Sequence, residues 1–425
     1  MKISYFSKNK FEIYQAPNLI EQFFLSKNFK KIDLNNINKS IDKNIFTKLF
    51  NRFVYYYEFF KKVKFLFKSP KKNKIIIFDD IGNEISFILK KENFFLINPR
   101  INSMKEIFLN YKILIFILFN IYKRSLKINY LIALINEIDP KIVITFIDNS
   151  QDFHKLSKYF DKKKDFVAVQ NANRGDYSFL KEKQKKNVHI QKLFCLGEFD
   201  VEFFRKNLIN NNPIVSGSLK NSIFFNKYKK EINEKILFDI CLIGKNIVKK
   251  GNTDLTYENL ILPESMILLN NLKKYLLNTK KSLVICCKNY GFKLEAEKYF
   301  YKKFFENINI SISTNAENIS DDNYFNSYKN LIKSEVIIGL PSTLLREAFF
   351  YKKKLLCFDY SNLDNHPFKN ISLCNESDYQ SFDQKLNLLF KINYEDYLKE
   401  LNYPNNYVIG KMDTINEIKS FLKIN

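Results

Sequence analysis

The stretch 334-SEVIIGLPSTLLREAFFYKKKLLCF-358 holds two apolar runs separated by a turn and a helical pattern. Val336–Ile338 is a short apolar run that ends at Gly339 and Pro341, two residue types that stop strands. Ser342 is a good N-cap for a helix that continues through Tyr351, and the second apolar run follows. The stretch therefore predicts strand, turn, helix and strand in a parallel α/β sheet.

The turn after the first of these strands is a candidate phosphate site. Ser342 and Thr343 offer hydroxyl groups, and the first backbone N–H groups of a helix are unpaired and attract negative charge. Glu347 follows about one helical turn later, where a carboxylate suits the hydroxyls of a ribose. The alternative is purely structural: Ser342 only caps the helix, and Glu347 is solvated or paired.

Short apolar runs alternate with helical patterns along the rest of the chain. Strands are expected at 75–78, 94–97, 141–147, 166–170, 193–197, 238–244, 282–287, 308–313 and 335–339. Helices are expected between them, including one from Met104 to about Arg124 and one from Asn129 to Glu137. A Lys-rich stretch after Asn226 separates two such halves. We therefore expect two α/β domains, over residues 1–226 and 227–425.

The formal net charge is +24, from 69 Lys and Arg against 45 Asp and Glu, which raises the question of nucleic-acid binding. Only six of these basic residues are Arg, and the lysines are spread in short groups without a nucleic-acid-binding motif. Lys, Asn, Ile and Phe are abundant together, which indicates that codon bias explains most of the charge. We expect no nucleic-acid partner; the basic surface suits anionic lipid headgroups or an acidic glycan.

The cysteines and the apolar runs indicate the compartment. Six cysteines lie without metal-ligand spacing and are expected as reduced, buried thiols: Cys195, Cys241, Cys286, Cys287, Cys357 and Cys374. The longest apolar run, Ile113–Phe119, is far shorter than the roughly 18 residues of a spanning helix, and no secretory leader opens the sequence. The expected location is the cytoplasm, with peripheral contact at the inner face of the cytoplasmic membrane.

Four polar motifs follow apolar runs in the first half: 145-TFIDNSQDF-153, 169-VQNANRGD-176, 196-LGEFD-200 and 215-VSGSLKNS-222. Together with the 334–358 stretch they resemble bacterial surface-carbohydrate biosynthesis proteins of the capsule and lipopolysaccharide type. Those proteins are similar in turn to retaining Kdo transferases, which are GT-B glycosyltransferases. The resemblance spans roughly residues 135–425. It implies two Rossmann-like domains facing across a cleft, the N-terminal one for the acceptor and the C-terminal one for the nucleotide-sugar donor.

The catalytic candidates lie at the ends of two strands in the first half. Asp148 ends a buried strand and opens a ligand-facing turn with Asn149, so its carboxylate is the candidate general base or nucleophile. Arg174 and Asp176 form a polar loop after the next strand, where an arginine fork suits the carboxylate or phosphate of an acidic sugar. The alternative for Asp148 is an Asx turn that caps the following helix.

The candidates on the donor side stand after strand ends or in the first turns of the helix that follows: Gly244, Lys245, Lys288, Ser342, Thr343, Arg346 and Glu347. Their hydroxyl and basic groups suit the charge that develops on a leaving nucleotide phosphate. Arg346 has the alternative of a surface ion pair. No Asp-x-Asp triplet occurs in the chain, and the resemblance implies transfer without a metal. We therefore expect neither a metal nor another cofactor.

The candidates for acceptor binding or inter-domain contact are Gly217, Ser218, Lys220 and His154. Gly217 is one of only nine glycines, a residue expected where φ is positive or where the backbone approaches a ligand closely; a tight packing turn is the alternative. Ser218 and Lys220 follow it directly. His154 falls one turn inside the helix after Asp148, which indicates a supporting role.

Three classes of function stay open at this point. The favoured one is a glycosyltransferase that moves a sugar from a nucleotide-activated donor, such as CMP-Kdo or another acidic sugar nucleotide, to a surface polysaccharide or lipid-linked glycan. The second is a polyol-phosphate transferase or a nucleotide-sugar 2-epimerase of the same architecture. The third is a basic, non-enzymatic protein that binds a membrane or RNA.

Overall fold

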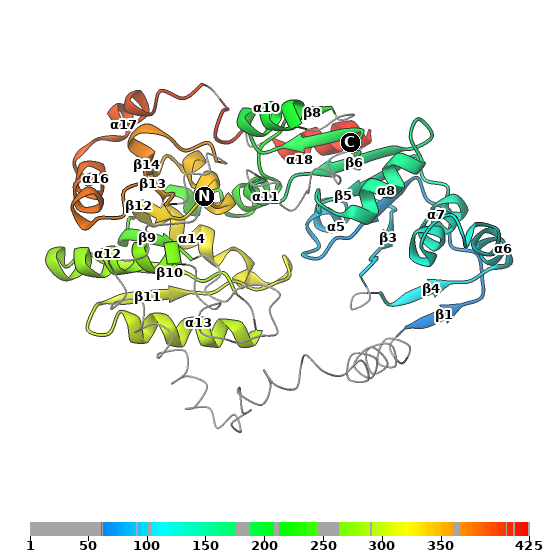
Figure 1. Cartoon of the computed structure of the whole chain (residues 1–425), viewed down its shortest axis with the longest axis horizontal. Helices are drawn as coiled ribbons and strands as arrows, with labels where there is room; N and C mark the ends of the chain where they lie inside the picture. The colour runs from blue at the N-terminus through cyan, green and yellow to red at the C-terminus, as the bar shows by residue number, and fades with distance from the viewer. Residues whose placement is uncertain are drawn as a thin grey trace. The chain divides into compact units, whose positions relative to one another are not determined.

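Two parallel sheets organise the described part of the chain (Figure 1). The computed structural model describes residues 61–423 except 62, 91, 101–103, 175–187, 208–211, 234, 245–262, 290, 361–365, 405 and 411–412. We call the unit within residues 45–227, 318–320 and 405–425 the N-terminal unit, and the unit within 228–317 and 321–404 the C-terminal unit. Each contains one six-stranded sheet.

The sheet of the N-terminal unit has the strand order β3-β2-β5-β6-β7-β8, and all neighbouring strands are parallel. Its strands are β2 (Ile75–Phe78), β3 (Phe95–Ile97), β5 (Ile142–Thr145), β6 (Asp165–Val169), β7 (Lys192–Cys195) and β8 (Pro213–Val215). In chain order this is 2-1-3-4-5-6. The order reverses between β2 and β5, and sheets of this kind bind ligands beyond the carboxyl ends of their strands at such a reversal.

Helices bury the apolar side chains of this sheet. They are α5 (Glu84–Ile88), α7 (Leu126–Ile138), α8 (Gln151–Tyr159), α10 (Glu198–Asn207), α11 (Leu219–Tyr228) and α18 (Thr414–Leu422). Ile76, Val143 and Ala168 on the strands are fully buried and join the core that includes Leu131 of α7 and Phe153 of α8. Near-continuous apolar strands are typical of parallel sheets, because helices cover both faces.

The sheet of the C-terminal unit has the order β11-β10-β9-β12-β13-β14 and is also parallel throughout. Its strands are β9 (Phe238–Ile243), β10 (Leu283–Cys286), β11 (Ile310–Ser313), β12 (Ser334–Gly339), β13 (Lys354–Phe358) and β14 (Leu373–Cys374). Its helices are α12 (Pro263–Thr279), α13 (Gly291–Phe304), α14 (Asn326–Ile332), α15 (Thr343–Ala348), α16 (Tyr379–Lys391) and α17 (Tyr394–Leu401). In chain order the strands run 3-2-1-4-5-6, the order of dinucleotide-binding sheets, with the reversal between β9 and β12.

The last segment of the chain packs within the N-terminal unit. The backbone N–H of Gly410 donates to the carbonyl of Leu196 (2.6 Å), and the Thr414 hydroxyl donates to the carbonyl of Ser216 (2.7 Å). These contacts attach the segment to the ends of β7 and β8. They place α18 on a sheet whose strands lie some 200 residues earlier in the chain.

The prediction of two Rossmann-like α/β domains is confirmed, including the strand, turn, helix and strand of residues 334–358. The helix after Ser342 is shorter than predicted, because α15 ends at Ala348 and a 3-10 turn covers Phe349–Tyr351. No helix among the described residues has both the length and the apolar character needed to cross a bilayer.

The predicted helix from Met104 to about Arg124 is wrong in its first part. Residues Glu106–Phe108 form β4, which pairs in parallel with β1 (Lys64–Leu66). Helix α6 (Tyr111–Asn120) begins only after Asn110, whose side chain accepts a hydrogen bond from the N–H of Ile113. The pairing partner lies about 40 residues earlier in the sequence, so local periodicity gave no sign of this strand.

Candidate functional site

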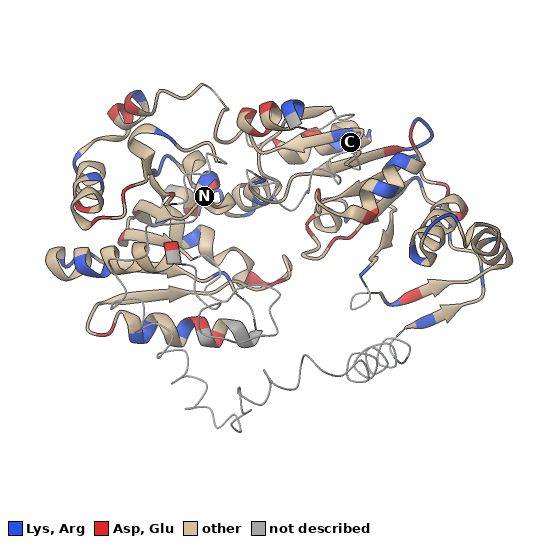
Figure 2. Cartoon of the chain, viewed as in Figure 1, with Lys and Arg blue, Asp and Glu red and all other residues tan. Residues whose placement is uncertain are grey.

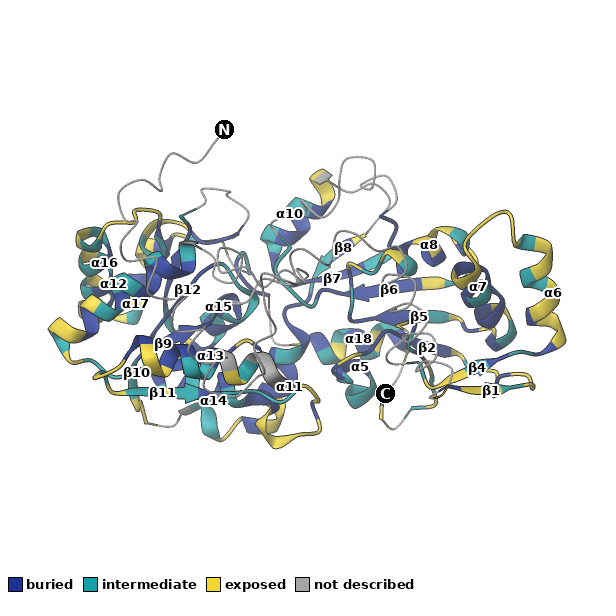
Figure 3. Ribbon diagram, turned by 60° about the horizontal axis from the view of Figure 1, so that its bottom comes forward, coloured by how far each residue is buried: buried dark blue, intermediate teal, exposed yellow. Residues whose placement is uncertain are grey.

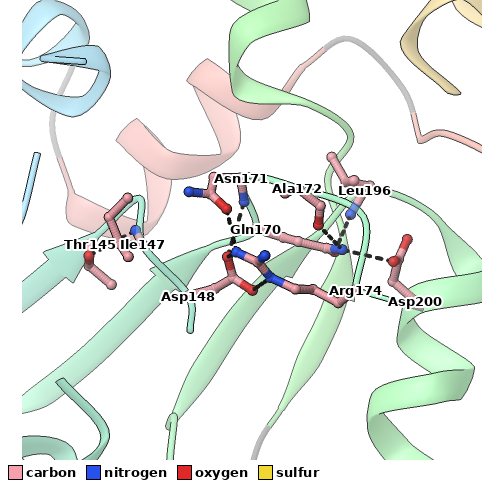
Figure 4. Close-up of polar contacts among 9 residues, drawn as sticks. All are labelled: Thr145, Ile147, Asp148, Gln170, Asn171, Ala172, Arg174, Leu196 and Asp200. Atoms are coloured by element: carbon pink, nitrogen blue, oxygen red, sulfur yellow. Dashed lines mark hydrogen bonds and ion pairs between the residues drawn. The ribbon is translucent and has the colours of Figure 1, made fainter. Parts of the chain in front are cut away.

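The site in the N-terminal unit is built around Asp148, just beyond the carboxyl end of β5 (Figure 4). The Thr145 hydroxyl accepts the N–H of Ile147 (3.0 Å), which shapes the turn that leads to Asp148. Arg174 grips the carboxylate with both arms of its fork: Nε donates to Oδ2 (2.8 Å), and Nη2 donates to Oδ1 (2.7 Å). The side chain of Asp148 is 1% exposed and that of Arg174 is 12% exposed. A charge-assisted, two-pronged pair of this kind fixes both side chains in one plane.

Asn171 completes this arrangement at the end of β6. Its backbone N–H donates to Oδ1 of Asp148 (3.3 Å), and its side-chain oxygen accepts a hydrogen bond from Nη2 of Arg174. Asp148 therefore connects the ends of two neighbouring strands. The alternative of an Asx turn is wrong for the following helix, because Ser150 caps α8 by accepting the N–H of Phe153 (3.4 Å).

His154 lies in α8 behind Asp148 and is buried. Its Nδ1 is 3.3 Å from the carbonyl oxygen of His189. Burial lowers the pKa of His154 from its ordinary value of 6.5, while the nearby charge of Asp148 acts in the opposite direction. The neutral imidazole is therefore the favoured form at neutral pH.

Sequence reasoning missed a second polar group at the same edge of the sheet, formed by Gln170 and Asp200. The Gln170 amide donates to Oδ1 of Asp200 (2.8 Å) and to the carbonyl of Ala172 (2.9 Å), and its oxygen accepts the N–H of Leu196 (3.0 Å). Oδ2 of Asp200 accepts the N–H of Gly197 (3.2 Å). Both side chains are buried, so this group holds the loops after β6 and β7 in a fixed conformation. The signal was present: both residues stand in the polar motifs that follow these strands.

Lys220 lies at the reversal of strand order in the N-terminal unit. Its Nζ is 3.2 Å from Oε1 of Glu84, at the start of α5, and 5.8 Å from the ring centre of Phe146, just after β5. Gly217 precedes α11, the helix that contains Lys220, and has a φ of 90°, a conformation that glycine adopts readily. The Ser218 hydroxyl accepts the N–H of Asn221 (3.3 Å) and so pairs a backbone donor in the first turn of α11.

The acidic residues after β2 were not among the predicted site residues, because they stand in the part of the sequence that the resemblance does not cover. Asp79 accepts Nε of Arg100 (2.8 Å), and Asp80 accepts the backbone N–H groups of Ile85 (3.2 Å) and Ser86 (2.7 Å). Burial raises the pKa of Asp80, although the hydrogen bonds from Ser86 act against this. These bonds hold the turn after β2.

In the C-terminal unit, Gly244 and Ser342, two of the predicted donor residues, follow the strands on either side of the reversal between β9 and β12. Gly244 follows β9 directly, and a Cβ placed on it would lie 2.7 Å from the carbonyl oxygen of Cys286 and 3.2 Å from Oε1 of Glu297. Only glycine fits there without a shift of the backbone. Glu297 accepts the N–H groups of Lys288 (3.2 Å) and Asn289 (2.9 Å) and thereby fixes the turn after β10.

Across the reversal, Ser342 follows β12. Its hydroxyl accepts the N–H of Leu345 (3.2 Å), as an N-cap does, and Thr343 beside it is half-buried. Glu347 is 3% exposed, and its Oε2 accepts the hydroxyl of Tyr328 (2.7 Å). The alternative of a solvated Glu347 is therefore wrong, whereas the alternative that it is paired agrees with this bond.

The remaining predicted residues fall in different places. Arg346 is fully buried, so its alternative as a surface ion pair is wrong. Lys288 and Asn149 are exposed. Asp176 and Lys245 lie outside the described residues. Asp148, Arg174 and His154 are thus brought together in one unit, and Gly244 and Ser342 lie on neighbouring strand ends in the other.

Comparison with known proteins adds the family. Residues 167–423 match the model of a family described as "putative O-antigen biosynthesis protein". The chain belongs to this family. Membership places it among proteins of bacterial surface-carbohydrate synthesis, as the resemblance of its motifs implied, and does not single out Kdo transfer. No curated protein matches the sequence.

Solved structures resemble the chain at low sequence identity. A UDP-N-acetylglucosamine 2-epimerase from Listeria monocytogenes, itself assigned only provisionally, is 13% identical with a TM-score of 0.50; the match covers 84% of this chain and 98% of that one. The UDP-GlcNAc 2-epimerase of Neisseria meningitidis (13%, TM-score 0.47, 83% and 99%) and the wall teichoic acid polymerase TagF (11%, 0.47, 83% and 89%) also match. The Listeria likeness shows the fold, which is GT-B with two Rossmann-like domains.

Proposed function

We propose that this member of the O-antigen biosynthesis family is a glycosyltransferase that moves a sugar from a nucleotide-activated donor to a surface polysaccharide or lipid-linked glycan. The observation that carries the proposal is the reversal of strand order between β9 and β12, with Gly244 directly after β9 and Ser342 at the turn after β12. Parallel sheets with this strand order bind nucleotides at that position. The C-terminal unit then holds the donor.

Three sets of predicted donor residues have distinct roles in the proposal. Ser342 and Thr343 supply hydroxyls for the donor phosphates, and Lys245 and Lys288 supply positive charge as the phosphate leaves. Glu347 holds the ribose. Its buried bond to Tyr328 supports this by fixing the carboxylate in one orientation before the ligand arrives.

Asp148 acts on the acceptor side, as a general base toward the acceptor hydroxyl or as a nucleophile toward the anomeric carbon. The bidentate contact with Arg174 holds both carboxylate oxygens of Asp148 in one position at a strand end. The fork of Arg174 was expected to grip the carboxylate of an acidic sugar such as Kdo; in this structure Asp148 occupies both of its arms. Asn149, Asp176 and Lys220 contribute further polar contacts to the acceptor, and His154 supports Asp148 from behind.

The reaction needs no resident metal or other cofactor in this proposal. Hydroxyls, backbone N–H groups and basic side chains stabilise the leaving phosphate instead. Turnover in excess EDTA should therefore equal turnover in its absence, and restoration of a lost rate by added Mg²⁺ would contradict this part. The protein is proposed to work in the cytoplasm, at the inner face of the membrane where lipid-linked glycans are assembled.

A product assay separates this proposal from its alternatives. The purified protein is incubated with CMP-, UDP- and GDP-sugars and with CDP-polyols, with and without a lipid-linked glycan fraction, and products are followed by mass spectrometry and ³¹P NMR. A glycosyltransferase adds one sugar to the acceptor and releases the nucleotide. A new sugar-nucleotide isomer without acceptor would indicate a 2-epimerase, and gain of a polyol phosphate would indicate a polyol-phosphate transferase. No product from any donor would favour a non-enzymatic basic protein.

A further inference from the structure

Helix α6 is apolar almost all round, yet most of it is exposed (Figure 3). Of its ten residues only Ile113 is buried, whereas Leu118 and Phe119 are 68% and 80% exposed. Tyr122, just after the helix, is fully exposed. A helix that is apolar on all sides is ordinarily buried, and a contiguous apolar surface of this kind marks an interaction site. We define the α6 patch by its exposed residues Tyr111, Leu114, Ile115, Leu118, Phe119, Ile121, Tyr122 and Leu126.

The charged side chains within the segment that forms the α6 patch all have one sign. Residues 111–127 contain four basic side chains and no Asp or Glu: Lys112, Lys123, Arg124 and Lys127. All four are exposed, and two reach carboxylates of neighbouring helices, Lys112 to Glu137 (3.9 Å) and Lys127 to Asp152 (2.7 Å). Figure 2 shows Lys and Arg distributed over both units. At the α6 patch, basic side chains stand next to an exposed apolar helix.

A second segment adds to the same corner. The amide of Asn110, which caps α6, donates to the hydroxyl of Ser69 (2.9 Å) and so ties the start of the helix to the residues after β1. Phe67 in that segment is 78% exposed, and Lys68 beside it is exposed as well. Apolar and basic side chains therefore alternate in two adjacent segments rather than in one.

We infer that the α6 patch docks on an anionic lipid bilayer. A helix of ten residues is about 15 Å long, against a hydrocarbon core of about 30 Å, so α6 would lie in the membrane interface and not span it. Apolar side chains enter the headgroup region, and the surrounding cations pair with anionic headgroups. Residues 111–127 contain no carboxylate that could pair with the cations of a second copy, so a symmetric dimer through the same patch is disfavoured.

This inference deepens the proposed function, because it states how the enzyme would reach a lipid-linked acceptor. The role in acceptor binding rests on the proposed glycosyltransferase activity. Vesicle binding does not rest on that activity, because it requires no donor or acceptor. The two are separable by experiment, since nucleotide binding is measured on the free protein and docking on the protein without nucleotide.

The test is co-sedimentation of the full chain with vesicles of phosphatidylcholine alone and vesicles that also contain phosphatidylglycerol. Wild type should bind the anionic vesicles, and added salt should weaken the binding. The affinity of the variant Leu118→Glu/Phe119→Glu for anionic vesicles should be at least about tenfold lower than that of wild type. The matched control Leu388→Glu/Leu398→Glu changes two exposed leucines of the C-terminal unit and should bind like wild type. The variant Lys123→Glu/Arg124→Glu should lose the preference for anionic vesicles.

Three results would overturn the docking inference: no binding of wild type to either vesicle, equal binding by the α6 variant, or a wild-type dimer that the α6 variant abolishes. The changed residues are exposed, so circular dichroism and melting temperature should show that all variants remain folded. Loss of vesicle binding with unchanged nucleotide binding leaves the proposed function intact. Vesicle binding without any nucleotide binding supports docking and contradicts the proposed function.

Discussion

Asp148 has both carboxylate oxygens engaged by Arg174 and almost no exposure, so its chemistry is set by that arginine. A carboxylate in this position is already oriented before the reaction, so no conformational entropy is lost to orient it in the transition state. Gln170 and Asp200 do the same for the adjacent loops, from the ends of β6 and β7. At the scale of residues, the candidate site consists of polar side chains that order turns at strand ends.

Replacement of Asp148 by Asn tests its role directly. The volume is kept, but the charge that would act as base or nucleophile is lost, so turnover in the product assay should fall by about 10²- to 10⁴-fold. Nucleotide-induced stabilisation should be unchanged. The control is Asp139→Asn: Asp139 is in an ion pair with Lys164 (2.7 Å) and has a φ of 54°, which Asn tolerates. Wild-type turnover in Asp148→Asn would move the catalytic group elsewhere.

The buried His154 predicts a dependence of stability on pH. Its pKa is lowered in the folded state, so the unfolded chain takes up the proton first as the pH falls. The free energy of unfolding should therefore decrease as the pH drops below about 6.5 and level off below the folded-state pKa. Urea unfolding of wild type and of His154→Gln at a series of pH values should show a shallower slope for the variant. Equal slopes would show that His154 is not the group responsible.

At the scale of elements, the C-terminal segment completes the N-terminal unit through close backbone contacts. The N–H of Glu198 donates to the carbonyl of Asn406 (2.9 Å), and a Cβ on Gly197 would lie 2.5 Å from the carbonyl oxygen of Tyr407. The loop after β7 and the segment before α18 therefore approach each other so closely that there is no room for a side chain. These contacts fix the two loops relative to each other.

Gly197→Ala should force the two backbones apart and destabilise the protein by about 1–3 kcal/mol. Gly339→Ala is the graded control, because its Cβ would meet the nearest backbone oxygen, that of Ile243, at 3.2 Å. Gly339→Ala should therefore lower the free energy of unfolding by less than Gly197→Ala does. Chemical denaturation gives both values, and the account of the loop contact fails if the order of the two variants is reversed.

At the scale of the whole molecule, the features that local sequence patterns encode are the ones that could be predicted. The apolar strands, the turn at Ser342 and the α/β class follow from composition and periodicity, and the structure contains them. The pairing of β4 with β1 was missed, because it depends on residues about 40 positions apart. The cores also contain Gln170, Asp200 and Glu347, whose partners come from other elements, so a single sequence shows the residue types without the bonds.

The burial of Arg346 and the exposure of α6 have a common explanation. A sequence pattern gives the polarity of a helix, but the surrounding elements decide which of its faces meet protein and which meet solvent. Arg346 was predicted at the donor site with a surface ion pair as the alternative, and it is buried; α6 is apolar in sequence, and most of it is exposed. Both departures from the local pattern lie where the account places function, at the donor side and at the membrane surface.

The central claim is that a nucleotide binds at the β9/β12 reversal, and a thermal-shift panel tests it most directly. Wild type, Ser342→Ala and Ser125→Ala are melted with CMP, CDP, UDP and GDP. Both variants lose the same kind of serine N-cap, on α15 and α7, and each should cost about 1 kcal/mol without ligand. At least one nucleotide should raise the melting temperature of wild type and Ser125→Ala, and the rise should be largely lost in Ser342→Ala. No rise with any nucleotide at saturating concentration, or a full rise in Ser342→Ala, would contradict the account.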